Sequence, residues 1–372
     1  MPYVPNLPNA YDKSLIPVSI RNSFFEETLL TNTFSGFMGT SSNDMIQVRD
    51  ESGSLGPTST FTLSREIDYK KFVTDYDQIS GKGQQLKFYE DHVTVNLQAA
   101  SDVLKGIQLT RTMTPIDIYN QLKPKLMTSH KRNLVYSLLN AATFGSYDPA
   151  GNVLPILNRC AVAGPNGSLM PLQATLNQTV AAQNTDATAA GNGLSVAHIE
   201  AIRDLAIRGG SSFEQEKRIT PVELSTRDGF PAPTYVYLMD TPSYKSLRAD
   251  PAWNQYFYRG MIENSYQPSR LSGSFVRGKI NDVLIYEVPE LGNFQITSGA
   301  VTSSWNLFCG AQAFGLVWRE KPWFNEERTN HGTVSEMALL EIRGQKSLKF
   351  PSYQNEANLA ENGIIHSIVR TA

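Results

Sequence analysis

The segment from Met45 to Gln98 most constrains the fold, because it contains four β-type stretches separated by turns. These stretches, MIQVR, TSTFTLSREI, QQLKFYE and HVTVNLQ, alternate apolar and polar residues or are rich in β-branched residues. Gly81-Lys82-Gly83 marks a turn before the third stretch. Arms of about 10 residues reach roughly 33 Å from their base, and a two-stranded ribbon is marginal alone in water. We expect either a projecting hairpin that leans on a partner or an ordinary sheet edge.

The stretch before this segment, to about Ser42, predicts an extended arm. Proline fixes φ and removes a backbone donor, so a proline-rich stretch cannot bury much of itself. A short helical patch is expected at Phe24–Leu30. Such an arm is either disordered or lies along a neighbour. Its prolines are Pro2, Pro5, Pro8 and Pro17.

A long helix is predicted after the β-type segment. Thr114 is suited to the N-cap and Pro115 to the first helical position, and Gly145 ends the pattern. Pro124 is expected to kink the helix or to split it at Lys123. Apolar residues recur near helical spacing at Ile118, Leu122, Leu126, Leu134, Leu138 and Leu139.

A second helix is predicted at Val196–Arg208, after a loop-rich stretch dominated by Gly, Ala, Asn and Thr. Ser195 is its expected cap and Gly209-Gly210 its stop. Further along, DVLIYEVPE and NLFCGAQAFGLVW are typical of buried strands, and EMALLEIRGQKSLKF of a final strand pair. Strands and helices mixed without a regular βαβ repeat indicate an α+β fold.

One strand-to-helix corner has the composition of an active site. In TYVYLMDTPSYK, the strand Tyr235–Met239 runs into a helix, with Asp240 and Thr241 at the turn. One hypothesis is therefore an α+β enzyme with its site at this pair. The preferred interpretation is a helix start, with Thr241 as N-cap, Pro242 in the first turn and Asp240 near the positive end of the helix dipole. Aromatic residues follow the corner, and we interpret them as core or subunit contacts.

Composition and charge exclude several classes of protein. The 372 residues exceed what one compact core usually holds, which predicts two or more subdomains. A net charge of −2 provides no basic surface for nucleic acid and no attraction to anionic membranes. Cys160 and Cys309 lack metal-ligand spacing, so we expect two free thiols in a reducing compartment. There is no signal-peptide pattern, and the apolar run Leu307–Trp318 is too short to span a bilayer.

Catalytic motifs are absent from the sequence. There is no G-x-S-x-G, H-E-x-x-H or Walker loop, and GAQAFG at Gly310–Gly315 lacks the lysine and hydroxyl of a phosphate loop. We interpret its small residues as a place of close strand packing. The scattered histidines favour surface or half-buried positions over metal ligands. We predict no catalytic residue, no cofactor and no metal site. The histidines are His92, His130, His198, His331 and His366.

Several blocks follow one another in a characteristic order: MIQVRDESGSLGPTSTFTLSREID, GKGQQLKFYEDHVTVNLQAA, IDIYNQLKPKLMTSHKRNLVYSLLNAATFG, EKRITPVELSTRDGFPAPTYVYLMDTPSYKSLRADPAWNQYF, VLIYEVPEL, NLFCGAQAFGLVW and EMALLEIRGQKSLKF. In this order they resemble the major capsid proteins of tailed phages with the Hong Kong 97 fold, closest to the family of coliphage N-four. The resemblance runs from about Phe34 to Phe350, and no single motif carries it. Pro124 and the tail after Phe350 depart from the pattern.

The resemblance implies an organisation for the whole chain. Its parts would be an N-terminal arm (1–44), an extended β-hairpin loop region (45–98), a peripheral domain with a long spine helix (99–144), an axial domain (145–312), a return to the peripheral domain (313–350) and a C-terminal tail (351–372).

The resemblance also implies a function. The chain would be a coat protein, not an enzyme, that self-assembles in the bacterial host cytoplasm into the icosahedral head around double-stranded DNA, bound without sequence specificity. Its partners would be its own copies in hexamers and pentamers, a separate scaffolding protein and a portal protein; a decoration protein is left open, and no membrane is involved. The alternative is a phage tail or receptor-binding module, although no repeat is visible. Candidate inter-subunit contacts are Gly81, Lys82, Gly83, Trp253, Tyr256 and Phe257.

Overall fold

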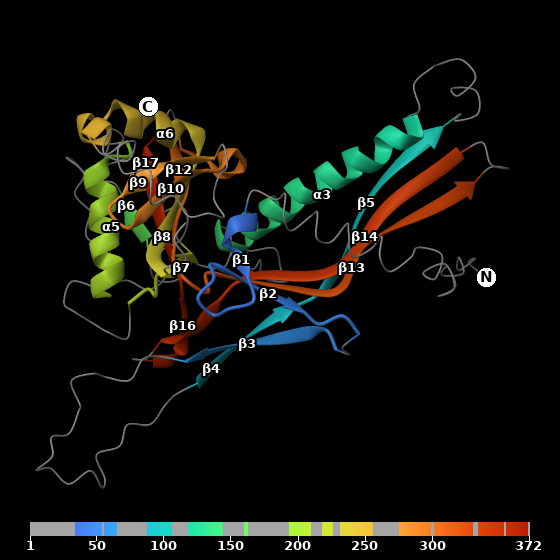
Figure 1. Ribbon diagram of the computed structural model, residues 1–372, viewed down its shortest axis with the longest axis horizontal. Coiled ribbons are helices and arrows are strands. Elements are labelled where there is room, and N and C mark those ends of the chain that lie inside the picture. The colour runs from blue at the N-terminus through green and yellow to red at the C-terminus, as the bar shows by residue number, and fades with distance from the viewer. Residues whose placement is uncertain are drawn as a thin grey trace, which may run out of the picture.

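A computed structural model describes residues 34–53, 56–64, 88–105, 118–143, 160–162, 193–209, 218–225, 231–255, 275–298, 301–329, 334–352 and 355–370. The molecule is elongated, with one sheet and two helices at one side and a long helix, α3 (Ile118–Thr143), lying along a second sheet at the other (Figure 1). Among the described residues, helices and strands are mixed without a βαβ repeat, and the predicted α+β class is confirmed.

The second sheet has five strands in the order β1-β2-β13-β14-β5. The antiparallel β13–β14 pair dominates it, with Phe314 opposite Ser347 and Thr329 opposite Val334. The predicted strand pair within EMALLEIRGQKSLKF is wrong, because most of this block is the single strand β14. In sheet order, the strands span Met38–Gly39, Ile46–Asp50, Phe314–Thr329, Val334–Ser347 and Asn96–Lys105.

The first sheet has eight strands, six of them in the order β6-β17-β12-β8-β10-β9, with β11 paired to β12 and β7 to β8. The predicted strand Tyr235–Met239 is confirmed as part of β8. Strand β17, from the tail that sequence patterns left unassigned, lies between β6 and β12. In chain order from β6 to β12, the strands are Cys160–Val162, Val222–Ser225, Pro231–Met239, Val276–Ile280, Val283–Glu287, Ile296–Ser298 and Val301–Cys309; β17 is Ile364–Arg370.

Two helices cover the eight-stranded sheet. Helix α5 (Val196–Arg208) begins and ends as predicted: the Ser195 side chain accepts from the His198 backbone N–H, and Gly209 has the left-handed φ of 79° that ends a helix. Helix α6 (Thr241–Ala249) corrects the predicted cap, because Asp240 and not Thr241 is the N-cap residue. Single 3-10 turns occur at Ser35–Phe37 (η2) and Pro289–Phe294 (η7).

Helix α3 is continuous through Pro124, so the predicted split is wrong. Proline removes one backbone hydrogen bond. Here its ring lies on an exposed side of the helix, and the Pro124 carbonyl accepts from Thr128 Oγ1 at 2.9 Å. The core contacts of the later turns, at Leu134 and Leu138, outweigh this local cost. The predicted cap at Thr114 and stop at Gly145 lie outside the described residues.

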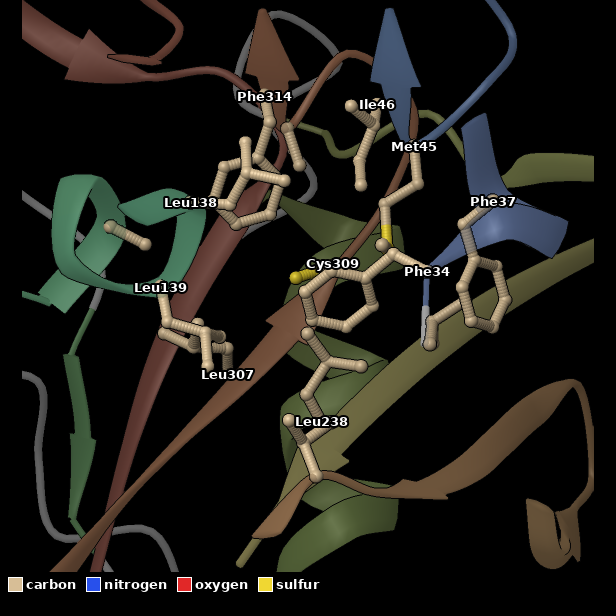
Figure 2. Packing of buried hydrophobic residues seen from close by; sticks show 14 of the residues in the cluster. Phe34, Phe37, Met45, Ile46, Leu138, Leu139, Leu238, Leu307, Cys309 and Phe314 are labelled. Carbon is tan, nitrogen blue, oxygen red and sulfur yellow. The ribbon is translucent and has the colours of Figure 1, made fainter. Parts of the chain in front are cut away.

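One hydrophobic core joins the two sheets. Figure 2 shows Leu138 of α3 beside Phe314 of β13 and Leu139 of α3 beside Leu307 of β12; Leu238 of β8 belongs to the same buried cluster. A second core lies between α5, α6 and the eight-stranded sheet, and it includes Trp253. The two sheets are therefore packed as one body around a shared interior.

The chain passes from one sheet to the other at 310–313, within the block that sequence patterns indicated as continuous strand. The Ala311 backbone N–H donates to Thr220 O at 2.8 Å, and the Gln312 N–H to Asp44 O at 2.8 Å. A Cβ at Gly310 would lie 2.4 Å from Thr220 O. The predicted close packing of these small residues is thus confirmed, but it occurs at a turn between β12 and β13.

Strands β3 (Thr58–Ser64) and β4 (Phe88–Thr94) form a separate two-stranded antiparallel sheet, which we call the ribbon. In the described part of the predicted segment, β3 pairs with β4, whereas residues 96–98 begin β5, an edge strand of the five-stranded sheet. The turn at Gly81-Lys82-Gly83 lies outside that part. A second small pair is formed by β15 (Lys349–Ser352) and β16 (Asn355–Glu361).

Candidate functional site

The base of the ribbon rests on the body through a small apolar cluster. Every second residue of β4 is buried, and Tyr89 and Val93 pack with Phe61 of β3 against Val317 and Leu348. The opposite face of β4 is exposed. The alternation of the sequence therefore assigns one face of the ribbon to the body and leaves the other open.

Gly344 allows the ribbon to approach β14 closely. A Cβ at this position would lie 2.3 Å from Thr94 O and 3.0 Å from Val93 Cγ1. A side chain here would force the end of β4 away from the sheet. The glycine inside β14 is thus explained by the close approach of β4 and not by a turn.

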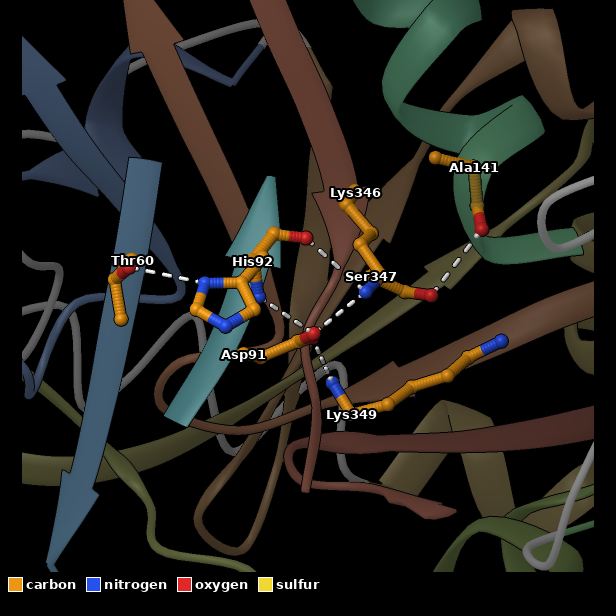
Figure 3. Close-up of polar contacts among 7 residues, drawn as sticks. All are labelled: Thr60, Asp91, His92, Ala141, Lys346, Ser347 and Lys349. Atoms are coloured by element: carbon orange, nitrogen blue, oxygen red, sulfur yellow. Dashed lines mark hydrogen bonds and ion pairs between the residues drawn. The ribbon is translucent and has the colours of Figure 1, made fainter. Parts of the chain in front are cut away.

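Asp91 ties the ribbon to β14 and β15 (Figure 3). Its buried side chain accepts from Lys346 Nζ at 2.5 Å, from the Lys349 backbone N–H at 2.8 Å and from the His92 backbone N–H at 2.8 Å. Lys346 Nζ also donates to His92 O at 3.2 Å. Charge-assisted hydrogen bonds of this kind are stronger than neutral ones, so they fix the position of β4.

The same polar network reaches α3 and crosses the ribbon. Ser347 Oγ donates to Ala141 O at 3.2 Å, which links the end of β14 to the last turns of the helix (Figure 3). Within the ribbon, Thr60 Oγ1 lies 2.9 Å from His92 Nδ1. The ribbon, the five-stranded sheet and α3 therefore meet at one polar site.

A buried charged cluster holds α3 on the sheet. Arg343 pairs with Glu341 at 2.6 Å and donates to Asn133 Oδ1 on α3 at 2.5 Å, while Trp318 Nε1 donates to Glu341 Oε2 at 3.0 Å. Burial raises the pKa of Glu341. Burial, and then the charge of Arg343, lowers the pKa of His130 to about 3. Because burying a pair of charges is costly, this cluster specifies where the helix lies more than it adds stability.

The predicted surface or half-buried positions are wrong for three histidines, because His130, His198 and His366 are buried. His366 Nδ1 accepts from Trp305 Nε1 at 3.0 Å, so its proton is on Nε2, which lies 2.6 Å from Glu361 Oε2. Their environments depend on tertiary packing, which a lone histidine in a sequence does not reveal. His92 is exposed as predicted, and His331 lies outside the described residues.

The Asp240 corner has a complete structural explanation. Asp240 accepts from the Ser243 backbone N–H at 2.9 Å, from Ser304 Oγ at 2.6 Å and from Gln295 Nε2 at 3.1 Å. It is fully buried. Thr241 Oγ1 instead donates to Glu287 Oε1 at 2.7 Å. A carboxylate with every oxygen occupied and no exposure cannot act on a substrate.

Cys309 is likewise unsuited to chemistry. It is a free, fully buried thiol, and burial, with the charge of Glu361 adding to it, raises its pKa far above the usual range. A thiol that stays protonated is not a nucleophile. Among the described residues, no group of three or more His, Cys, Asp or Glu side chains could hold a metal ion. No described helix is long and apolar enough to cross a membrane.

Of the predicted contact residues, Trp253 alone lies within the part of the chain that the structure describes. Gly81, Lys82, Gly83, Tyr256 and Phe257 lie outside the described residues. Trp253 is 3% exposed and packs in the core with α5 and β10. Of the two roles predicted for it, core packing is the one that its burial indicates.

Asp91 and Lys346 were not predicted from the sequence. A signal for Asp91 was present, because it lies in register with Tyr89 and Val93 on the apolar face of an alternating strand. A charged residue at such a position requires a partner from elsewhere. That the partner is Lys346 depends on the packing of β4 over β14, which no local pattern contains.

Comparison with solved structures gives one consistent fold. The capsid of Ralstonia phage GP4 is similar with a TM-score of 0.68 at 22% sequence identity, over 92% of each chain. The capsid of cyanophage Pam1 is similar with a TM-score of 0.62 at 17% identity, over 92% of this chain and 93% of that one. The acid-stable capsid of Helicobacter pylori bacteriophage KHP30 is similar with a TM-score of 0.64 at 13% sequence identity, over 92% of this chain and 91% of that one.

These likenesses establish a phage capsid fold, and the sequence itself establishes the family. A search of curated proteins found no significant match. The family described as phage capsid protein matches residues 10–368, nearly the whole chain. The enzyme hypothesis at Asp240 and Thr241 is therefore wrong. The chain belongs to the phage capsid protein family, and it is the structural major capsid protein of a phage head.

Proposed function

We propose that this capsid protein forms the icosahedral head of a tailed, double-stranded DNA phage, with the ribbon extending over a neighbouring copy. The observation that carries the proposal is the one-sided packing of the ribbon. Its inner face rests on the body, whereas its outer face is open and Phe88 is 65% exposed. A two-stranded ribbon is only marginally stable alone, and its open face offers a surface on which a neighbouring copy would add to the contacts with the body.

The finer assignments extend this proposal. We place the chain in the Hong Kong 97 fold, closest to the N-four-like capsids, with an arm at 1–44, a hairpin loop region at 45–98, a peripheral domain at 99–144 and 313–350, an axial domain at 145–312 and a tail at 351–372. The shared core of the two sheets suits peripheral and axial parts that move as one body. Hexamers and pentamers of the chain would make the shell.

The remaining partners follow from the same proposal. A separate scaffolding protein would guide assembly in the host cytoplasm, and a portal protein would occupy one vertex; a decoration protein is left open. Packaged DNA would be enclosed without sequence specificity. The net charge of −2 suits a container, because a strongly basic inner surface would bind phosphates tightly.

The proposed contacts between copies are the ribbon turn, Gly81-Lys82-Gly83, and the aromatic pair Tyr256 and Phe257. Trp253 would support this pair from the core, since it is buried. Lys82 at a hairpin tip is either a contact to a neighbouring copy or a solvated residue that keeps the turn soluble.

Deletion of Ile79–Gln85 tests the proposal. The subunit should remain folded, with an unchanged far-ultraviolet circular dichroism spectrum, but closed shells should be lost in negative-stain images. A matched control replaces the same residues with an equal number of Gly and Ser, which preserves reach and removes the side-chain contacts. Normal shells from the deletion would refute an assembly role for the ribbon. If the Gly and Ser replacement gives normal shells and the deletion does not, assembly depends on the length of the ribbon and not on its side chains at 79–85.

A further inference from the structure

The outer edge of β3 is covered by side chains instead of a strand. The carbonyls of alternate residues point to the same edge of a strand. Pro57 O faces the β4 side, because it accepts from the Val95 backbone N–H at 2.9 Å. The carbonyls of Thr58, Thr60 and Thr62 therefore point to the opposite, outer edge. Each of these three carbonyls accepts a hydrogen bond from a side chain.

The three donors come from neighbouring positions of the body. Arg319 Nη2 donates to the first carbonyl at 2.8 Å, Arg49 Nη1 to the second, and Gln312 Nε2 to the third at 3.4 Å. Arg319 belongs to β13, Arg49 to β2, which pairs with β13, and Gln312 to the turn before β13. Three side chains thus follow the edge of β3 as the backbone of a neighbouring strand would. We call them the edge clamp.

The body holds the donors in place. Arg319 lies 3.2 Å from Glu51 Oε2, and Glu51 Oε1 in turn accepts from Ser59 Oγ of β3 at 2.5 Å. Gln312 Nε2 also donates to Gln47 Oε1 at 3.0 Å. Arg319 and Gln312 are therefore oriented by the body, so less rotamer freedom is lost when they contact the ribbon.

Two features indicate that the edge clamp positions the ribbon more than it stabilises the fold. Arg319 is 8% exposed, yet its Nε and Nη1 have no hydrogen-bond partner, which is a cost in stability. The guanidinium of Arg49 lies 4.7 Å from the ring centroid of Phe61, so a charged group covers the apolar contact beneath the ribbon. Apolar contacts alone allow sliding, whereas three successive hydrogen bonds define one register and one direction.

We propose that Arg319, Arg49 and Gln312 are positioning residues that set the direction in which the ribbon leaves the body. The consequence for assembly rests on the proposed function, in which the ribbon contacts a second copy. The same side chains occupy the outer edge of β3, and so close it to a strand of another copy.

The direction of the ribbon can be measured with two spin labels. Glu90→Cys lies on the exposed face of β4 and Lys125→Cys on the exposed side of α3, in a Cys160→Ser background; Cys309 is buried. Electron paramagnetic resonance then gives the distance distribution in dilute subunits. The parent should show a narrow distribution, and R49M/R319M one at least twofold broader. The matched control is R277M, since Arg277 is paired with Glu287 in the eight-stranded sheet and should leave the width unchanged.

The outcomes separate this inference from the proposed function. A distribution in R49M/R319M as narrow as in the parent overturns the positioning role, whatever the shells look like. A broad distribution with normal shells supports positioning and contradicts the assembly role of the ribbon. If the double variant does not fold, the single variants decide: Q312L should broaden the distribution, while R319K, which keeps a donor for the Thr58 carbonyl, should stay narrow. An unchanged width in Q312L would then contradict the inference.

Discussion

The eight-stranded sheet and the ribbon differ in what pairs with the edges of their strands. Strand β8 has a neighbouring strand on each side, β10 and β12, and its side chains from Thr234 to Met239 are buried on both faces. Strand β3 has β4 on one side and the edge clamp on the other. The side chains on both faces of β8 pack within the subunit, whereas the ribbon packs against the subunit on one face only. Substitutions in the sheet should therefore change the free energy of unfolding, and substitutions at the ribbon should change assembly.

Trp305→Ala in β12 should have the largest effect on stability. The side chain is fully buried in the shared core and donates a hydrogen bond to His366. Its removal leaves a cavity and a buried acceptor, so the free energy of unfolding should fall by about 4 kcal/mol. Urea denaturation measures the loss. A loss below about 1 kcal/mol would mean that the core of the sheet is not tightly packed and would remove the contrast with the ribbon.

Acid should weaken the sheet through His198. Burial lowers its folded-state pKa from 6.5 to about 4, so the unfolded chain binds the proton first as the pH falls. The stabilisation present above pH 6.5 should be lost progressively down to about pH 4, by about 3 kcal/mol in total. Denaturation at several pH values should show a shallower dependence in His198→Gln than in the parent. Equal slopes in the two proteins would rule out this histidine as the cause.

Asp240→Ala and Thr241→Ala should differ, because the structure makes Asp240 the cap. The first removes the cap and leaves the buried donors of Ser304 and Gln295 without their acceptor, which should cost about 2 kcal/mol. The second removes one hydrogen bond to Glu287 from an exposed residue and should cost about 0.5 kcal/mol. Thermal unfolding of both variants provides the comparison. The reverse order would restore Thr241 as the cap.

Lys346→Met should have a small effect on stability and a large one on assembly. Its ion pair with Asp91 is partly exposed, and Asp91 keeps the Lys349 backbone N–H, so the loss should be at most about 1 kcal/mol. The yield of closed shells, counted in electron micrographs, should fall at least tenfold. Lys125→Met, on the exposed side of α3, is the control and should assemble normally. If both variants give normal shells, the ribbon base does not control assembly.

Sequence patterns predicted correctly those elements whose ends are determined by residues at the ends themselves. Helix α5 is correct at both ends because Ser195 and Gly209 end it by their own side chain and backbone. Alternate residues of β4 are buried, which agrees with the alternation seen in the sequence, but the predicted bounds are wrong: β4 joins the end of QQLKFYE to the start of HVTVNLQ, and the rest of HVTVNLQ begins β5. The block NLFCGAQAFGLVW at 306–318 was interpreted as buried strand without a turn, since a buried strand and the next one share an unbroken apolar pattern and the turn between them contains no proline.

The site was less predictable because its partners are distant in the chain. Asp91 meets Lys346, and Arg319 meets Thr58, through the packing of the ribbon on the sheet. No periodicity encodes that packing. The Asp240 cap was missed for a smaller reason: Asp and Thr are both good caps, and only the position of the Ser243 backbone N–H distinguishes them.

The place of β17 has a consequence for the timing of synthesis. This strand lies between β12 and β6, and its buried residues Ile364 and Ile368 complete the eight-stranded sheet. Until residues 364–370 have left the ribosome, one side of β12 has no neighbour and stays open to other chains. We therefore expect the subunit to become competent to join a shell only after β17 has been synthesised. Truncated chains that end before it are expected to aggregate, and this keeps unfinished copies out of the head.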